Sequence, residues 1–245
     1  MSAVTRRQFV QIAGIATIAV SHSAAAATTE IATAAAAVPS NGAGAFDHVS
    51  TPVPLPFDTH KLAGLSERLL QSHWENNYSG AVKALNTVRS RLSQALADST
   101  TPPYVYNALK REQQVRSGSV VLHELYFANL GGDGKAPAKV RSVLAAAFGS
   151  FDTWETEFRR IGQGLGGGSG WVMLGYNHGL KLLENYCMGD HATAPATVTP
   201  LLMMDMYEHA YQMDYGAGAA KYIDALFVNL QWDKVAERLS MISVG

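Results

Sequence analysis

Cysteine is nearly absent from this chain of 245 residues, and Cys187 is the only one. A single thiol excludes a disulfide within the chain, and it also excludes a metal cluster held by several thiolates. A lone cysteine is usually a small buried hydrophobic residue, and we expect this of Cys187.

The sequence also lacks an excess of charge of either sign. Its 19 lysine and arginine residues stand against 20 aspartate and glutamate residues, which leaves a net charge of −1. This balance gives no global electrostatic reason to expect a nucleic acid or an anionic membrane surface as a partner. The apolar run at 12–20 is far shorter than the ~20 residues of a membrane-spanning helix. We therefore expect no nucleic acid among the partners and no stable membrane insertion.

What the N-terminus does contain is the pattern of an export signal over residues 1–27. The adjacent Arg6 and Arg7 precede the short apolar run, and AAAA at 24–27 offers small residues for a signal peptidase. The pattern resembles a bacterial twin-arginine signal, whose pathway exports proteins that are already folded. The ordinary secretory route and a chance basic N-terminus are the alternatives. We expect the mature protein in the periplasm.

The folded part is predicted to begin near Leu55. Residues 28–54 are rich in Ala, Thr, Ser, Gly and Pro without a periodic apolar face, which indicates a flexible linker. Apolar residues at helical spacing then predict one helix, or two joined end to end, over 66–96 and another from about 104 to 130. Because the short break STTPP at 99–103 separates them, the two helical segments are predicted to form an antiparallel hairpin.

The second half of the chain mixes helices and strands. A helix is predicted at 137–148 and another from Asp152, which has capping-box spacing with Glu155. Three strand-like runs follow, and their short connections favour an antiparallel meander; they lie at 171–177, 180–186 and 198–204. The tail from Tyr207 is mostly helical. The sequence thus predicts an α+β fold, with an antiparallel α-helical hairpin domain at 55–135 and a C-terminal domain at 136–245 that holds a small three-stranded antiparallel sheet and surrounding helices.

Three histidines and one aspartate share an unusual apolar setting. His73 and His123 lie on the apolar faces of the predicted hairpin, and His209 follows Asp205 by four residues after the apolar run VTPLLMM. A charge in such surroundings is normally paired or bound to a metal. Three imidazoles and a carboxylate suit Fe, Mn or Zn with one position left open for solvent. One buried histidine alone is more often a satisfied core residue, and spacing does not prove that the two halves meet.

Two other kinds of site are disfavoured. The stretch GQGLGGGSG at 162–170 satisfies GxGxxG, but it follows a predicted helix, whereas a dinucleotide site follows a strand. A zinc hydrolase of the HExxH type is a poor alternative, because that motif is absent from the sequence.

Over residues 55–243 the chain resembles the iron/manganese superoxide dismutase family. The motifs that carry the resemblance occur in order along the chain: LPFD at 55–58, the histidine of SHWENNYSGAVKALN, VLHELYFANLGG at 121–132, FGSFDTWETEF at 148–158, GSGWVML at 168–174 and DMYEHAY at 205–211. The last of these matches the family's closing signature, an aspartate, two residues and then Glu-His-Ala-Tyr.

The resemblance implies a site for one Fe or Mn ion per chain. Its ligands would be His73, His123, Asp205 and His209, with a bound water or hydroxide as the fifth. The reaction implied is a two-step cycle that converts superoxide and protons to oxygen and hydrogen peroxide. The alternative is a non-dismutating periplasmic metal-binding relative that kept the ligands but lost the proton-relay residues.

The resemblance also implies roles for residues around the ligands. Glu208 looks like the residue that crosses the interface of family dimers to the ligand histidine of the other subunit, so we expect a homodimer or higher homo-oligomer. Trp171 and Phe127 match the aromatic walls of the metal pocket, although both are equally compatible with plain core packing.

The sequence departs from the family around the first ligand. Asn77 and Ala81 stand where relatives usually carry a second histidine and a tyrosine that guards the substrate channel. Tyr78 is the nearest tyrosine and is kept as a candidate catalytic residue, although on an α-helix it lies about 100° from Asn77. Gln212 follows Tyr211 where many relatives have another tyrosine, one that would pair with the missing histidine.

The outer-sphere glutamine that touches the bound solvent in the family is also changed. It comes either from the position four before the second ligand or from the sheet. Ser119 occupies the first place and is unsuited to the role. His191, in MGDHATA, falls close to the second place, and some relatives use histidine there. We expect His191 to be this catalytic residue, with a surface-loop histidine as the alternative.

Overall fold

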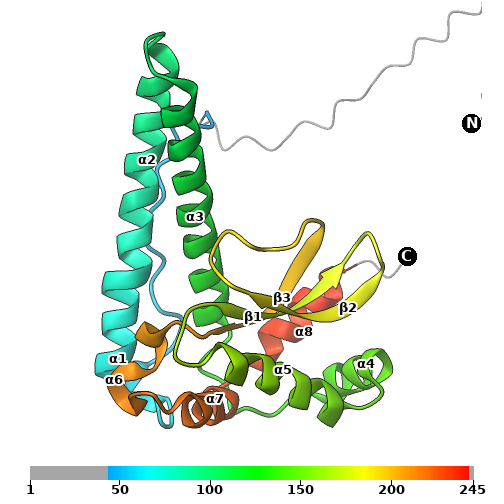
Figure 1. Cartoon of the computed structure of the whole chain (residues 1–245). Helices are drawn as coiled ribbons and strands as arrows, with labels where there is room; N and C mark the ends of the chain where they lie inside the picture. The colour runs from blue at the N-terminus through cyan, green and yellow to red at the C-terminus, as the bar shows by residue number, and fades with distance from the viewer. Residues whose placement is uncertain (1–43, 243–245) are drawn as a thin grey trace, which may run out of the picture. The chain divides into compact units, whose positions relative to one another are not determined.

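The computed structural model describes residues 44–242, and Figure 1 shows their arrangement. The predicted export signal at 1–27 and the first part of the predicted linker lie outside the described residues. Within them, an antiparallel helical hairpin is followed by a three-stranded antiparallel sheet and further helices. The predicted α+β fold class is confirmed.

The hairpin is built from helices that lie side by side along their length (Figure 1). Its first arm runs without a break through α1 (Glu67–Ser72), a π-helical segment (His73–Tyr78) and α2 (Ser79–Ala97), and the second arm is α3 (Pro103–Ala128). The Ser66 side chain caps the start of α1 by accepting the Leu69 N–H. Pro103 occupies the first position of α3, where its missing N–H costs no helical hydrogen bond.

The π-helical segment changes which side chains share a face with His73. The Ser79 N–H donates to the Trp74 carbonyl, a step of five residues in place of the α-helical four. The residue five after His73 is Tyr78, which is 1% exposed, whereas Asn77 is only half-buried. The π-helical segment thus brings Tyr78 into the core five residues after His73.

Residues 48–53 run along the hairpin, held by hydrogen bonds. The Val53 N–H donates to the Tyr78 hydroxyl, and the Trp74 indole N–H donates to the Val53 carbonyl, both over 2.8 Å. Ser50 and Asn86 exchange two further bonds. The segment just before Leu55, the predicted start of the fold, is thus held against the hairpin, because polar side chains of the hairpin satisfy its backbone groups.

Two helices follow the hairpin, α4 (Ala138–Phe148) and α5 (Phe151–Leu165). The first residue of α5 is Phe151, and the Ser150 side chain caps the helix by accepting the Thr153 N–H. The predicted capping box of Asp152 and Glu155 is therefore wrong, because the helix begins two residues earlier than that box requires.

The sheet consists of β1 (Trp171–Asn177), β2 (Leu182–Met188) and β3 (Val198–Asp205), all antiparallel, in the order β2-β1-β3. The predicted meander is wrong, because β3 pairs with β1 and not with β2. Cys187 lies on edge strand β2 and is exposed, so its predicted burial is wrong as well. The central strand β1 begins at Trp171, opposite Asp205 in β3.

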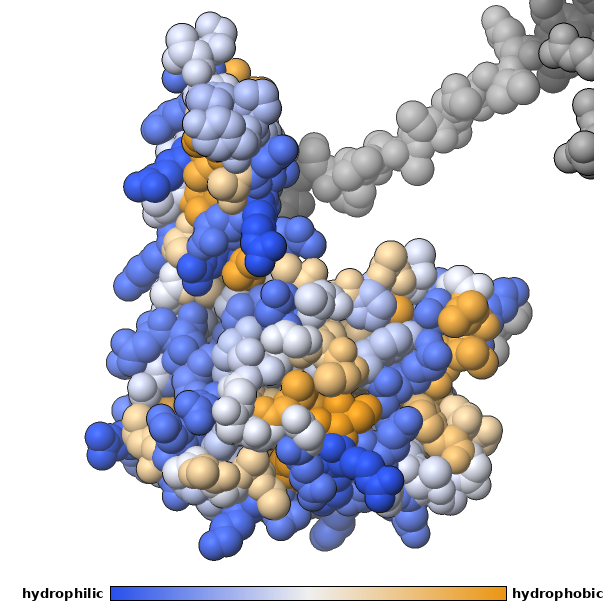
Figure 2. Space-filling model, in the orientation of Figure 1, coloured by the Kyte–Doolittle hydropathy of each residue, from blue (hydrophilic) through white to orange (hydrophobic). Residues whose placement is uncertain are grey.

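The chain ends in short helical pieces around the sheet. These are a 3₁₀ turn (Glu208–Ala210), α6 (Gln212–Tyr215), α7 (Ala219–Val228) and α8 (Trp232–Met241). In the view of Figure 2, hydrophilic residues cover most of the hairpin, and apolar residues form separate areas. Across residues 44–242, no helix combines the length and the apolar character required to span a membrane.

Candidate metal centre

Four side chains from four different elements converge between the hairpin and the sheet. His73 comes from the π-helical segment, His123 from α3, Asp205 from the end of β3 and His209 from the 3₁₀ turn. One ligand atom from each lies within 4.8 Å of the others. The convergence that spacing alone did not prove is present in the structure.

The chain turns sharply between the last two of these residues. Asp205 is the final residue of β3, and its Oδ1 accepts the Tyr207 N–H over 2.9 Å. The 3₁₀ turn then brings His209 back to the carboxylate, with Nε2 3.2 Å from Oδ2 of Asp205. The four-residue spacing therefore acts across a strand end and a turn, not along one helical face.

The Asp205 carboxylate is the centre of the group. Its Oδ2 lies 3.1 Å from Nε2 of His73 and 3.6 Å from Nε2 of His123. Despite this proximity, neither of these two nitrogens has a hydrogen-bond partner of acceptable geometry among the described residues. Buried polar atoms are rarely left unpaired, so two such nitrogens aimed at one carboxylate call for an additional group between them.

A backbone carbonyl fixes the orientation of His123. Nδ1 of His123 lies 2.6 Å from the Ser119 carbonyl oxygen, one helical turn earlier in α3. Because a carbonyl only accepts, Nδ1 carries the proton and Nε2 presents its lone pair to the centre. This is the arrangement in which histidines usually bind metals, with the second nitrogen held by a backbone or carboxylate oxygen.

Burial sets the protonation of the centre. It lowers the pKa of His73 and lowers that of His123 to about 3, with a further contribution from the neighbouring His73. For Asp205, burial acts to raise the pKa, but the charge and hydrogen bond of His209, together with the nearby His73, outweigh it, and the pKa lies well below its ordinary value. Near neutral pH the two histidines are thus neutral and the aspartate is ionised.

These residues fit a metal cation. Metal ligands must be deprotonated, and the buried histidines and the aspartate already are. The side chains of His73 and Asp205 are 1% and 0% exposed, so the carboxylate charge is withdrawn from water and requires a positive partner. Three imidazole nitrogens and one carboxylate oxygen suit Fe, Mn or Zn.

Aromatic rings enclose the centre. The Trp171 ring lies 5.1 Å from that of His123, and the Phe127 ring lies 5.0 Å from that of His73, so the structure brings both predicted wall residues to the site. Sequence reasoning missed Tyr222, whose hydroxyl donates to the Asp205 carbonyl over 2.7 Å and lies 3.2 Å from the Tyr126 hydroxyl. A tyrosine within the apolar helix YIDALFVNL was the available signal, because a buried hydroxyl needs a partner.

His191 lies beside the centre in a fixed orientation. Its Nδ1 accepts the Trp171 indole N–H over 2.9 Å, and its ring stacks on Tyr207 at 4.6 Å with an interplanar angle of 7°. Burial lowers the pKa of His191, which favours the neutral ring. Because Nδ1 accepts, the single ring proton sits on Nε2 and is available for donation. The His191 and His123 ring centroids are 5.9 Å apart.

The Tyr78 hydroxyl is directed away from the four ligands. It donates to Glu124 Oε1 over 2.8 Å and accepts the Val53 N–H, and burial raises its pKa to about 12. Its ring remains near the centre, 6.3 Å from that of His123. A catalytic role for Tyr78 stays a prediction, and the geometry assigns its hydroxyl to the contact between the hairpin and residues 48–53.

The remaining predicted residues occupy different environments. Glu208 is exposed and Asn77 is half-buried. Tyr211 is fully buried, where its hydroxyl accepts the Gly167 N–H over 3.0 Å and its ring stacks on Tyr222. Tyr211 therefore anchors the chain behind the ligands, and the roles of Glu208 and Asn77 stay predictions.

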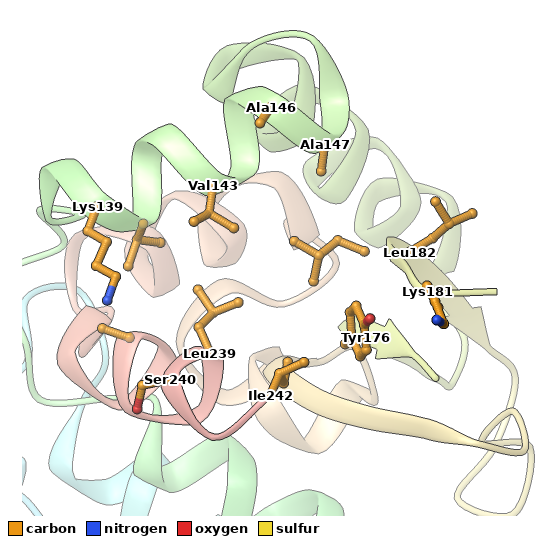
Figure 3. A pocket seen from close by; sticks show the side chains of 13 residues that line it. Lys139, Val143, Ala146, Ala147, Tyr176, Lys181, Leu182, Leu239, Ser240 and Ile242 are labelled. Carbon is orange, nitrogen blue, oxygen red and sulfur yellow. The ribbon is translucent and has the colours of Figure 1, made fainter. Parts of the chain in front are cut away.

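A cavity of about 610 Å³ lies elsewhere, lined by residues of α4, β1, β2 and α8 and of the segments that adjoin them (Figure 3). Its lining is mostly apolar and includes Val143, Leu239 and Ile242, with Lys139 and Lys181 among the few polar side chains. None of the four converging residues lines this cavity, which is therefore separate from the candidate metal centre.

Comparisons with known proteins point to a single family. The family model "Iron/manganese superoxide dismutases, C-terminal domain" matches residues 136–238. "Superoxide dismutase [Fe]" of Cupriavidus metallidurans is 46% identical over 187 residues, which cover 76% of this chain and 94% of that protein. The Fe enzyme of Aquifex pyrophilus is 32% identical over 72% of this chain and 85% of its own length. "Superoxide dismutase [Mn]" of Mycobacterium intracellulare is 30% identical over 71% of this chain and 84% of its own.

Proposed function

The chain belongs to the iron/manganese superoxide dismutase family, and from this premise we propose that it is a metal-dependent superoxide dismutase. Two superoxide ions and two protons give one molecule of oxygen and one of hydrogen peroxide. The observation that carries the proposal is the convergence of His73, His123, Asp205 and His209 within 4.8 Å. Among the described residues, Nε2 of His73 and Nε2 of His123 have no hydrogen-bond partner.

Different residues of the site would hold the metal ion, orient its ligands and exclude water. When bound, an Fe or Mn ion supplies the one-electron chemistry, oxidising one superoxide and reducing the next. The four converging residues would hold that ion, and the Ser119 carbonyl keeps His123 turned with its Nε2 lone pair inward. Trp171, Phe127 and Tyr126 form apolar walls that limit the entry of water.

His191 is the residue we propose to complete the site as a hydrogen-bond donor. The Trp171 N–H occupies its Nδ1, and its Nε2 forms no hydrogen bond with any residue in the described part of the chain. A neutral imidazole with a free N–H beside the ligands suits donation to solvent or substrate oxygen atoms at the centre. This is the role predicted for His191 from the sequence.

The function is tested by a dismutation assay on protein of measured metal content. We expect activity that rises in proportion to bound Fe or Mn, disappears when a chelator removes the ion and returns when the ion is restored. Near-zero activity with a full metal complement would instead favour the non-dismutating relative, which the replacements Asn77 and Ala81 make a specific alternative.

Export through the twin-arginine route is a further part of the proposal. It is supported by Arg6 and Arg7 ahead of the apolar run in the first 27 residues. A chain with both arginines changed to lysine is expected to lose most of its periplasmic pool and to accumulate in the cytoplasm. An unchanged periplasmic pool, measured by fractionation and immunoblot, would contradict export by this route.

We also propose that the protein is a homodimer or a higher homo-oligomer. The support is Glu208, which is exposed one residue before the ligand His209, so a carboxylate is free to contact a second copy beside the metal centre. Light scattering on the purified protein is expected to give at least twice the mass of one mature chain, and a monomeric mass would contradict this.

A further inference from the structure

The loop that carries His191 is closed on itself by hydrogen bonds. The Ala192 N–H donates to Asp190 Oδ1 over 2.7 Å, and the Asp190 N–H donates to Thr193 Oγ1 over 3.2 Å. The Thr193 hydroxyl in turn donates to the Asp190 carbonyl over 3.0 Å. Such a short, self-bonded loop moves as one unit, so a displacement of its backbone also moves the His191 side chain.

Helix α3 supports this loop at two positions one turn apart. The Gln114 side-chain amide donates to the Ala192 carbonyl over 3.2 Å. At Gly118, a Cβ atom would lie 1.8 Å from the His191 carbonyl oxygen and 2.8 Å from its carbonyl carbon. Residues four apart share a helix face, so Gln114 and Gly118 form one docking surface for the loop. Only glycine permits so close an approach of the two backbones.

The contact at Gly118 extends to the metal centre through His191. The ring of His191 is held on one side by the 2.9 Å bond from Trp171 and on one face by Tyr207. These two contacts and the backbone contact with α3 fix the ring in place. A side chain at position 118 would push the loop outward by more than an ångström, because real contacts with a Cβ are rarely below 3.0 Å. A 2.9 Å hydrogen bond does not survive such a shift.

We propose that Gly118 is a positioning residue, whose missing side chain sets how closely His191 approaches the metal centre. The expected effect on the dismutation rate rests on the proposed function, whereas the contact between Gly118 and the His191 backbone does not depend on the reaction. A glycine inside a helix costs stability relative to alanine, and the close approach of the loop explains why a glycine stands at this position.

The test compares Gly118→Ala with Gly164→Ala, in the full chain. Both glycines lie in helices, so both substitutions stiffen the helical backbone, but a Cβ at Gly164 would meet nothing within 4 Å. The first readout is the indole N–H resonance of Trp171 in protein loaded with diamagnetic Zn²⁺, assigned by its absence in Trp171→Phe. The second is dismutation per bound Fe or Mn. His191→Ala gives the reference value of each readout for a protein that lacks the imidazole ring.

We expect Gly118→Ala to retain its metal, to move the Trp171 resonance toward its position in His191→Ala, and to lose ~10–100-fold in dismutation rate, the order of effect that a 1 Å misplacement produces. Gly164→Ala should match the wild type in both readouts. A Trp171 resonance at the wild-type position in Gly118→Ala would overturn the proposal. If wild-type protein with a full metal complement were inactive, the proposed function would fail while the resonance still tested Gly118.

A milder variant covers the case in which Gly118→Ala does not fold. Gln114 is exposed, so Gln114→Ala removes only its bond to the Ala192 carbonyl. We expect a smaller shift of the Trp171 resonance in the same direction and a few-fold loss of rate. No change in either readout would show that α3 does not position the loop.

Discussion

Protein with His123 replaced by alanine is expected to be purified almost free of Fe and Mn and without dismutase activity. Loss of a group that merely orients a metal ligand already costs ~10–100-fold in affinity. Loss of the ligand itself should cost at least ~100-fold, or about 2.7 kcal/mol. The measurement is metal content by mass spectrometry on protein purified from cells grown with each metal.

The same substitution should also destabilise the fold. His123 is 1% exposed and contacts Trp171 and Phe127, so its removal leaves a cavity that costs roughly 2–4 kcal/mol. For a chain of this size the melting temperature should fall by about 5–15 °C. The matched control is Leu85→Ala, which creates a cavity in the hairpin core but should keep its metal. Unchanged metal content in His123→Ala would refute the ligand assignment.

Asp205→Asn is expected to abolish metal retention with little change of shape. The amide oxygen can still accept the Tyr207 N–H, but the only carboxylate among the converging residues is gone. The remaining site of three imidazoles and an amide is neutral and offers no negative charge to compensate that of a divalent or trivalent cation. We therefore expect its metal affinity to fall by ~100-fold or more, roughly 3 kcal/mol. A full metal complement in this variant would contradict the assignment.

The lowered pKa of Asp205 is tested by the pH dependence of the unfolding free energy, compared between the metal-free wild type and metal-free Asp205→Asn. The pKa of Asp205 in the folded protein is below its ordinary value of 3.8, so the unfolded chain binds its proton first as the pH falls. The stabilisation is fully present above about pH 4 and is lost as the pH falls through the folded-state pKa. Urea unfolding between about pH 5 and pH 2 should show a larger loss of unfolding free energy for the wild type than for Asp205→Asn. Equal losses would contradict the lowered pKa.

The four converging residues could be picked out from the sequence as candidates because buried ionisable groups are costly, and the family resemblance joined them into one ligand set. Asp205 and His209 follow the apolar run VTPLLMM, and His73 and His123 interrupt apolar helical faces, so each residue is conspicuous locally. The helices were predictable for a related reason. Periodicity and breakers such as the prolines at 102–103 act within a few residues, and α2, α3 and α4 lie close to their predicted positions.

The surroundings of the four ligands could not be predicted in this way, because they depend on geometry that sequence periodicity does not contain. The π-helical step after His73 places Tyr78 in the core and leaves Asn77 half-buried. The glycine at 118 was visible as a glycine in the middle of a predicted helix, but its reason is the carbonyl of His191, 73 positions later. No local pattern identifies a partner at such a distance.

The sequence by itself determined the candidate metal ligands, the class of fold and the approximate bounds of its longest helices, because burial cost and hydrogen bonding within a helix act over a few neighbouring positions. Only the tertiary structure decided that β3 lies beside β1, that the Tyr78 hydroxyl faces residues 48–53, and that α3 supports the His191 loop. These arrangements follow from contacts between segments far apart in the chain, and their energies exist only once those segments have met.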